Sequence, residues 1–251
     1  EQAASIAAES AARTASNEIG VCCVTTGPGA TNAITAVAGA WIESTPMLVI
    51  SGQVKRQDML NGRTLRQRGA QEVEITKLVN HITKYNFVIE DPTDVIFVLG
   101  KAFHEATTGR KGPVWVDVPL DIQGTQVPEP HEMKKFTPPA AVDTADIPIS
   151  RIISLLKKSE RPLFFWGNGA KASTQKDKIR SVIKKHSLPS LFTWNASDIL
   201  DYHHEMNFGR PGVVAQRHPN ISVQNADLIV CLGTSLDNVL TAYNPKNFGR
   251  N

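Results

Sequence analysis

Short runs of apolar and β-branched residues alternate along the chain with longer segments whose apolar positions recur at helical spacing. Three runs in the first half predict buried strands, at 21–26 (VCCVTT), 46–51 (PMLVIS) and 113–118 (PVWVDV). The Ala-rich segment 2–17 and a small-residue segment ending near Glu43 predict helices beside them. This order of helix, strand, glycine turn, helix and strand is typical of a parallel α/β sheet.

The same pattern returns in the second half of the chain, after a stretch that is rich in proline. A prediction for the remaining elements gives strands at 82–89, 162–166, 190–194 and 227–232, and helices at 92–108, 149–159 and 175–186.

We therefore expect an α/β fold with two doubly wound parallel-sheet domains, both of them incomplete. Residues 1–127 form the first domain in this prediction, and residues 148–251 form the second, which is truncated. A Pro-rich linker at 128–147 joins them, because its prolines interrupt a stretch with little periodic apolar pattern. The chain begins with Glu1 rather than Met, and we expect a fragment of a longer protein.

Composition narrows the function classes. The 251 residues are 41% hydrophobic and 20% charged, which is ordinary for a globular protein and excludes a disordered or collagen-like chain. The net charge of +3 comes from scattered residues, so we expect no nucleic-acid partner. No apolar run approaches the ~20 residues of a membrane helix, so we expect no membrane partner. The odd count of cysteines (Cys22, Cys23 and Cys231) indicates reduced thiols, best explained as small buried residues in a cytoplasmic protein.

A carboxylate and a glycine turn are expected at one edge of the first sheet. Parallel sheets bind ligands beyond the carboxyl ends of their strands. The turn Gly27–Gly29 directly follows strand 21–26, and Glu1 opens the helix before that strand. Glycine allows close approach of a ligand ring, and Pro28 stiffens the turn. Each feature alone also has a plain structural explanation, as a helix-dipole partner for Glu1 and as an ordinary turn.

Two other groups of residues give weaker signals. The turn Gly167–Ala170 follows strand 162–166 in a position that suits a nucleotide, but the full Gly-x-Gly-x-x-Gly spacing is absent. The segment 201–205 contains Asp201, His203, His204 and Glu205, but adjacent histidines point in different directions and no second ligand pair has suitable spacing. We expect no metal site in this chain.

The residues around the first glycine turn resemble a known family. Glu1, followed by a helix and then TTGPGATN at 25–32, is similar to the pyrimidine-binding domain of thiamine diphosphate enzymes, in the group of acetolactate synthase large subunits. The resemblance continues in the second half, which is similar to the central domain of that family. Further matching segments are PMLVISGQV at 46–54, GAQE at 69–72, ITKY at 82–85, GRKGPVWVDVP at 109–119, QNAD at 224–227 and LG at 232–233.

The resemblance implies roles for individual residues. The matching glutamate hydrogen-bonds the pyrimidine nitrogen of the cofactor, which places Glu1 in the catalytic and cofactor-binding role. By the same match, Gly27, Pro28, Gly29 and Asn32 bind the cofactor, and Gln71 faces the substrate pocket. The first strand and helix of the family's pyrimidine domain are expected to be absent.

The resemblance also implies a reaction and its components. A 2-oxo acid such as pyruvate is decarboxylated, and the acyl unit passes to a second carbonyl. Thiamine diphosphate is the cofactor, Mg²⁺ is held by a C-terminal domain absent from this chain, and FAD could bind at Gly167–Ala170 and Gly233–Tyr243. The active site lies between subunits of a homodimer or homotetramer, so this chain alone is expected to be inactive.

Two departures from the family pattern keep other functions open. Ala70 stands where acetolactate synthases carry an aromatic residue, and Leu120 stands where they carry lysine. These changes favour an acceptor other than a second pyruvate. The alternatives are a thiamine diphosphate-dependent 2-oxo acid decarboxylase or oxidase, and, from another class, a non-catalytic α/β nucleotide-binding module. A dinucleotide-dependent dehydrogenase is disfavoured by the incomplete glycine spacing.

Overall fold

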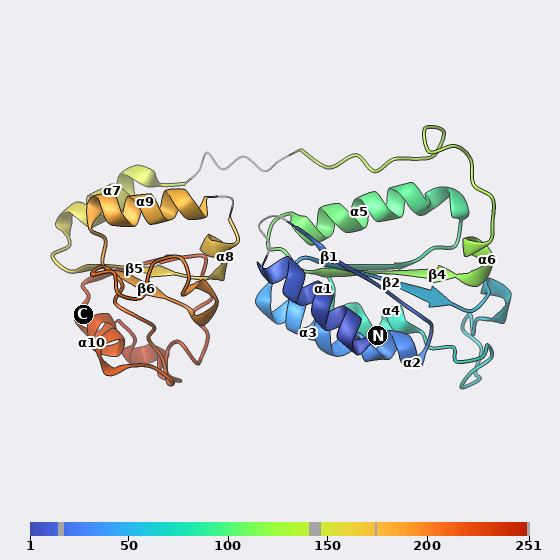
Figure 1. The fold of residues 1–251 in the computed structure, drawn as a ribbon, viewed down its shortest axis with the longest axis horizontal. Helices are drawn as coiled ribbons and strands as arrows, with labels where there is room; N and C mark the ends of the chain where they lie inside the picture. Colours follow the sequence, from blue (N-terminus) through green and yellow to red (C-terminus); the bar gives the residue numbers. More distant parts are fainter. Residues whose placement is uncertain (15–17, 141–146, 174, 250–251) are drawn as a thin grey trace. The chain divides into compact units, whose positions relative to one another are not determined.

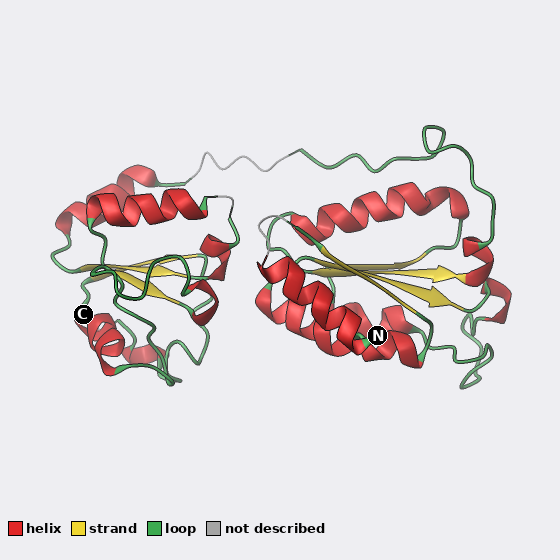
Figure 2. Cartoon of the chain, in the orientation of Figure 1, coloured by secondary structure: helices red, strands yellow, loops and turns green. Residues whose placement is uncertain are grey.

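The computed structural model describes residues 1–14, 18–140, 147–173 and 175–249. The chain separates into two compact units, Glu1–Ala141 and Val142–Asn251. Each unit contains one parallel sheet with helices packed against both of its faces (Figures 1 and 2). The predicted α/β fold with two parallel sheets is therefore confirmed.

The first unit is built on a four-stranded sheet with the order β1-β2-β4-β3, and all of its strand pairs are parallel. The central pair, β2 and β4, is in register from Met47 opposite Pro113 to Gln53 opposite Pro119. Helices cover both faces of these central strands, which explains their nearly continuous apolar sequences. The strands are β1 (Gly20–Val24), β2 (Met47–Gln53), β3 (Tyr85–Val88) and β4 (Pro113–Pro119).

Helices lie against both faces of this sheet (Figure 1), and an apolar layer lies between the sheet and the helices on each face. The layer around Val49 and Trp115 receives Ala8 of α1 and Val37 of α3. The opposite layer, around Val116, receives α5. Burial of these apolar surfaces is the main stabilising contribution to such a sheet. The helices of this unit are α1 (Gln2–Thr14), α2 (Pro28–Asn32), α3 (Ile34–Glu43), α4 (Ile75–Val79), α5 (Val95–Thr107) and α6 (Leu120–Gln123), with 3₁₀ turns at Arg56–Asp58, Asn80–Ile82 and Pro92–Asp94.

The second unit has a three-stranded parallel sheet with the order β6-β5-β7. Ile183 of α9 packs on one face of it and Val223 of α10 on the other (Figure 1). The elements are α7 (Ile149–Lys158), β5 (Pro162–Trp166), α8 (Asn168–Lys171), α9 (Lys176–His186), β6 (Ser190–Phe192), α10 (Arg217–Asn225) and β7 (Leu228–Leu232), with 3₁₀ turns at Trp194–Ala196 and Pro245–Asn247.

The segment between the predicted domains remains packed on the first unit beyond residue 127. Met133 is buried, and the Phe136 ring lies 5.7 Å from that of Phe97 and 5.3 Å from that of His104. These contacts attach the chain to α5 as far as Phe136. Residues 141–146 of the predicted linker, and residues 15–17 of the first predicted helix, lie outside the described residues.

The prediction of buried cysteines is correct for Cys22 and wrong for Cys23 and Cys231, which are exposed. Strands β1 and β7, which carry these residues, are edge strands of their sheets. Successive side chains of a strand point to opposite faces, so neighbouring Cys22 and Cys23 have different surroundings. All three thiols are free.

Gly27 and Gly39 provide a matched test of the turn after β1. Gly27 has φ 59° and ψ −120°, and a Cβ added there would overlap the backbone oxygen of Gln71. Gly39, in α3, has no atom within 4 Å of an added Cβ. We expect Gly27→Ala to lower the free energy of unfolding by at least ~1–3 kcal/mol, because only glycine adopts this backbone conformation readily. Gly39→Ala should raise it by up to ~1 kcal/mol.

Urea denaturation of both variants measures this difference. Equal stability of Gly27→Ala and the wild type would mean that the turn and residue 71 do not need their close approach.

Candidate functional site

A cavity of about 1130 Å³ opens at the carboxyl edge of the first sheet. It lies where β1, β2 and β4 end, which is the position expected for a ligand in a parallel sheet. Its lining combines apolar residues such as Val54, Val118 and Leu120 with a few polar ones such as Glu1 and Gln53, as is usual for small-molecule sites. The lining residues are Glu1, Ala4, Cys23–Thr26, Ile50–Lys55, Asp58, Arg68–Ala70, Val118, Leu120 and Gln123.

Glu1 lines this cavity and lies directly beside the glycine turn that follows β1. One of its carboxylate oxygens, Oε1, lies 3.0 Å from the position that a Cβ of Gly29 would take. The other, Oε2, accepts a hydrogen bond of 3.5 Å from Nδ2 of Asn32. Helix α1 begins directly after Glu1, whose backbone oxygen accepts a hydrogen bond from the amide of Ser5. The structure thus brings together Glu1, Gly29 and Asn32, as the position of the turn predicts.

Gln71 lies beside the same turn, but it is not among the residues that line the cavity. Its backbone oxygen packs against Gly27, and its own φ is 59°. The Gln71 side chain is exposed, and its neighbours Gly69 and Ala70 line the cavity instead. The substrate-facing role of Gln71 therefore stays a prediction.

Glu72 holds the loop that forms one wall of the cavity. The loop folds back so that the carboxylate of Glu72 accepts hydrogen bonds from the amides of Leu60, Arg68 and Gly69. Burial alone raises the pKa of this carboxyl, but the three amide hydrogen bonds outweigh it and hold the pKa below its usual value. The nearby charge of Arg68 lowers the pKa further, so Glu72 is ionised at neutral pH and holds the wall through its bonds to the backbone amides.

Charged residues, and two residues that differ from the family pattern, are among those that line the cavity. Lys55, Asp58 and Arg68 line it, and the Arg68 guanidinium donates a hydrogen bond to the backbone oxygen of Gln57. Ala70 and Leu120, the two positions that depart from the family pattern, also line it. The departures therefore change the surface that a ligand in this cavity would meet.

A buried carboxyl group lies next to the cavity. Asp117 of β4 is 1% exposed, and its two oxygens accept hydrogen bonds from Ser51 Oγ and from Gln53 Nε2, the latter at 3.0 Å. The indole of Trp115 in turn donates to Ser51 Oγ at 2.7 Å. Burial raises the pKa of Asp117 to about 6, against the opposing effect of the two hydrogen bonds.

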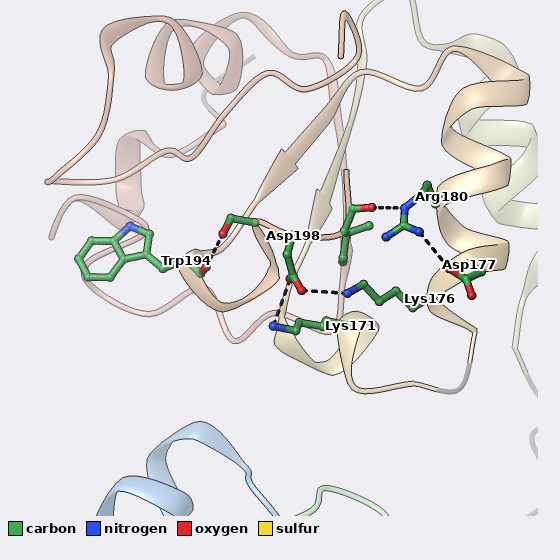
Figure 3. Close-up of polar contacts among 8 residues, drawn as sticks. Lys171, Lys176, Asp177, Arg180, Trp194 and Asp198 are labelled. Atoms are coloured by element: carbon green, nitrogen blue, oxygen red, sulfur yellow. Dashed lines mark hydrogen bonds and ion pairs between the residues drawn. The ribbon is translucent and has the colours of Figure 1, made fainter. Parts of the chain in front are cut away.

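The second unit presents a different polar cluster at the carboxyl ends of β5 and β6. Figure 3 shows Asp198 between Lys171 and Lys176, with Nζ–Oδ distances of 3.1 and 2.8 Å. Burial raises the pKa of Asp198, but the hydrogen bonds from Lys176 and Lys171 outweigh it and leave the pKa below its usual value. Arg180 pairs separately with Asp177 at 3.0 Å.

The glycine turn of this unit is used for packing. A Cβ at Gly167 would overlap the backbone of Gly233, so the two turns after β5 and β7 approach too closely for side chains. The hydroxyl of Thr193, just after β6, is buried and has no hydrogen-bond partner among the described residues. The Trp194 ring points away from the ion pairs in Figure 3 and is half-exposed.

The segment 201–205, which resembled a metal site in sequence, forms a turn. The amides of His203 and Met206 donate to the Asp201 carboxylate and to His204 Nδ1. Within the described residues, no group of three or more His, Cys, Asp or Glu side chains is arranged to hold a metal ion. In the same part of the chain, no helix combines the length and the apolar character needed to cross a bilayer.

Two family models match the chain in the two regions described above. Residues 1–78 match the N-terminal TPP binding domain of thiamine pyrophosphate enzymes, and residues 149–251 match the central domain of the same enzymes. The first match contains Glu1 and the glycine turn. This chain belongs to the thiamine pyrophosphate enzyme family.

Similar curated proteins carry the name acetolactate synthase. The large subunit from Lactococcus lactis subsp. lactis (strain IL1403) is 31% identical over 261 residues, covering 100% of this chain and 43% of that protein. The probable large subunit from Methanocaldococcus jannaschii is 31% identical, covering 96% and 40%. Acetolactate synthase 1, chloroplastic, from Oryza sativa subsp. japonica is 32% identical, covering 96% and 37%. The chain thus spans about two fifths of the length of these relatives.

Three buried polar residues at the cavity of this member of the thiamine pyrophosphate enzyme family were not predicted from the sequence. Ser51, Gln53 and Asp117 lie in strands that are otherwise apolar and buried. Buried polar side chains are uncommon and need partners, which was the available signal. Their partners lie 20 to 66 residues away in the chain, so spacing gave no indication of the network.

Titration of Asp117 should appear in the pH dependence of stability. An acid whose pKa is higher in the folded protein binds its proton more tightly there, so its contribution to the free energy of unfolding falls as pH rises from about 4 to about 6. A pKa of about 6 against the ordinary value of 3.8 for this group corresponds to a loss of about 3 kcal/mol. We expect Asp117→Asn to lack this fall.

Urea denaturation, monitored by fluorescence at a series of pH values, measures the free energy of unfolding at each pH. Asp177→Asn, in the second unit and well exposed, is the matched control and should keep the wild-type profile. Parallel profiles for the wild type and Asp117→Asn would show that Asp117 does not titrate in this range.

Proposed function

We propose that this chain forms the pyrimidine-binding half of the active site in a thiamine diphosphate-dependent, acetolactate synthase-like enzyme. The enzyme would decarboxylate a 2-oxo acid such as pyruvate and transfer the acyl unit to a second carbonyl. The observation that carries the proposal is the position of the Glu1 carboxylate, which lines a large cavity at the carboxyl edge of the sheet and lies beside Gly29 of the glycine turn.

The cavity fits the pyrimidine part of this cofactor. A flat heterocycle needs an apolar surface, a close approach to backbone and one or two polar groups. The turn residue in contact with Glu1 is Gly29, which has no side chain, and an added Cβ there would lie 3.0 Å from Oε1 of Glu1. Asn32 gives Glu1 an amide partner that limits its rotation.

The side chains of this chain would bind, orient and move a proton. Bound thiamine diphosphate supplies a nucleophilic carbon and an electron sink for 2-oxo acid decarboxylation. Glu1 would share a proton with a pyrimidine ring nitrogen and so select the tautomer. Gly27, Pro28 and Gly29 would border the ring, and Asn32 would hold the Glu1 carboxylate in place.

The substituted positions bear on the acceptor. Leu120 and Ala70 line the cavity where acetolactate synthases carry lysine and an aromatic residue. A missing fixed cation weakens recognition of a second carboxylate, so we propose an acceptor carbonyl other than pyruvate. Gln71 would reach this substrate from the neighbouring loop.

The remaining components follow the family. We propose that Mg²⁺ and the diphosphate are held by a segment of the protein other than this chain. The assembly would be a homodimer or homotetramer with the site between subunits, in the cytoplasm. The 251 residues alone would then be inactive.

A thiamine diphosphate-dependent decarboxylase or oxidase is the closest alternative, because it needs the same carboxylate and turn. Product analysis with pyruvate and an added aldehyde separates it from a carbon–carbon bond-forming enzyme. A non-catalytic nucleotide-binding module is the alternative from another class, and it predicts no response to thiamine diphosphate.

Glu1→Gln tests the central role. In the full polypeptide that its gene encodes, with thiamine diphosphate and Mg²⁺, we expect this variant to slow exchange of the thiazolium C2 proton by ~10²–10⁴-fold, because the amide cannot take the proton. Proton NMR of quenched samples measures the exchange. Glu18→Gln makes the same change of charge at an exposed position outside the cavity and should exchange like the wild type.

The two possible failures can be told apart. Absence of cofactor binding by the wild type would contradict the proposed function, whereas wild-type exchange in Glu1→Gln would contradict only the role of Glu1.

FAD is a second proposed ligand, held by the second unit near Gly167–Ala170 and Gly233–Tyr243. The supporting observation is the buried Thr193 hydroxyl without a partner. Thr193→Val should weaken FAD binding several-fold, because one hydrogen bond contributes ~1 kcal/mol. Flavin fluorescence titration measures it. The hydroxyl deletion Ser222→Ala on α10 is the control, and unchanged affinity in Thr193→Val would remove Thr193 from the site.

A further inference from the structure

The side chain of Gln53 uses every hydrogen-bonding position that an amide offers. It is 5% exposed and lies at the end of β2. Its Oε1 accepts from the Thr26 hydroxyl at 3.1 Å and from the Val54 amide at 2.9 Å. Its Nε2 donates to the Val73 backbone oxygen at 2.9 Å and to Asp117 Oδ2 at 3.0 Å. Two donors and two acceptor positions are thus all satisfied.

The partners fix the orientation of this amide. A flipped side chain would turn Oε1 toward the Val73 oxygen and the Asp117 carboxylate, which are both acceptors. It would also turn the amino group toward the Val54 amide, which is a donor. The network therefore allows one orientation only. Asp117 itself accepts a hydrogen bond from the Ser51 hydroxyl, so the carboxylate that receives the Gln53 amino group is held in place.

The contacts of Gln53 join two walls of the cavity that are far apart in sequence. Thr26 directly precedes the turn that faces Glu1, and it lines the cavity. Val73 follows the loop that contains Ala70 and Gln71. These two walls also touch directly, where the Gln71 backbone packs against Gly27. The Gln53 amide is the side chain that bonds to both walls at once.

We propose that Gln53 is a positioning residue, which sets the separation between the cofactor-facing turn and the wall at 69–73, with Asp117 as its anchor. The inference rests on the proposed function, because it assigns this separation to the binding of the thiamine diphosphate pyrimidine. Gln53 acts on the turn through Thr26 and on the opposite wall through Val73.

An exchange of the two groups across the 3.0 Å hydrogen bond tests the proposal. Gln53→Glu keeps the acceptor for Thr26 and Val54 but places an oxygen against the Asp117 carboxylate, where two like charges repel. Adding Asp117→Asn restores a donor and an acceptor in exchanged positions and leaves the Ser51 contact intact. The double variant still lacks the donor to Val73 and places an acceptor oxygen against that backbone oxygen.

We expect Gln53→Glu to weaken thiamine diphosphate binding by ~10–100-fold, as is typical when the supporting partner of a binding group is removed. The double variant should recover the part of this loss that comes from repulsion at Asp117, while the part that comes from the missing donor to Val73 should remain. The titration uses the full polypeptide with Mg²⁺, at a temperature well below each unfolding midpoint. C2 proton exchange, measured on the same samples, should slow in Gln53→Glu and recover in part in the double variant.

The control removes a buried hydrogen bond far from the cavity. Thr83 is buried, donates to the Val79 backbone oxygen and accepts from Asn86, and it does not line the cavity. Thr83→Val should lower the unfolding midpoint and leave cofactor affinity unchanged. A purely structural role for Gln53 would give this same result.

Each outcome of these measurements either supports the positioning role of Gln53 or contradicts one of the two proposals. Wild-type cofactor affinity in Gln53→Glu, or a double variant no better than the single one, would overturn the positioning role while the wild type still binds. If Gln53→Glu does not fold, the comparison between the wild type, Asp117→Asn and the double variant still tests the exchange. Failure of the wild type to bind would contradict the proposed function instead.

Discussion

The constraint on which the first unit depends is that the polar groups inside its sheet must find partners within the molecule. Ser51, Gln53 and Asp117 stand on central strands with helices on both faces, so water does not satisfy them. An unpaired buried group of this kind costs ~1–3 kcal/mol. Their mutual hydrogen bonds avoid this cost only in one arrangement of β2, β4 and the segments around Thr26 and Val73. The cavity wall is therefore fixed by the same bonds that satisfy the interior.

This coupling explains why the loop over the cavity needs few apolar contacts of its own. The loop from Leu60 to Gly69 is largely exposed. The Glu72 carboxylate accepts hydrogen bonds from backbone amides of this loop, and these bonds hold its conformation where apolar burial would otherwise do so. Val73, the residue after Glu72, accepts a hydrogen bond from the Gln53 side chain through its backbone oxygen. Backbone amides, one carboxylate and one carboxamide thus place a polar segment with little hydrophobic surface.

The sequence was sufficient for elements whose order depends on apolar burial. The runs PMLVIS and PVWVDV became β2 and β4, and PLFFW is β5 to the residue, because strands covered on both faces have continuous apolar sequences. Helix α10 was missed, since RHPNISVQN contains a proline and buries only Pro219 and Val223. The approach of Glu1 to the glycine turn was predictable from strand order, whereas the partners of Gln53 depend on tertiary contacts across 20 to 64 residues.

The same contrast applies to the site, where some features need only backbone geometry and others need particular side chains. The carboxylate and the turn need only backbone geometry and one side chain, which a parallel sheet provides wherever a strand ends in Gly-Pro-Gly. Under the proposed function, the acceptor site needs particular side chains at the rim. Leu120 and Ala70 line the cavity there in place of the lysine and the aromatic residue that the family resemblance implies. An exposed leucine at that place removes charge without removing volume. The cations in the lining are Lys55, just after β2, and Arg68, whose amide donates to the Glu72 carboxylate. Under the proposed function, a substrate carboxylate would therefore be recognised from these two segments rather than from position 120.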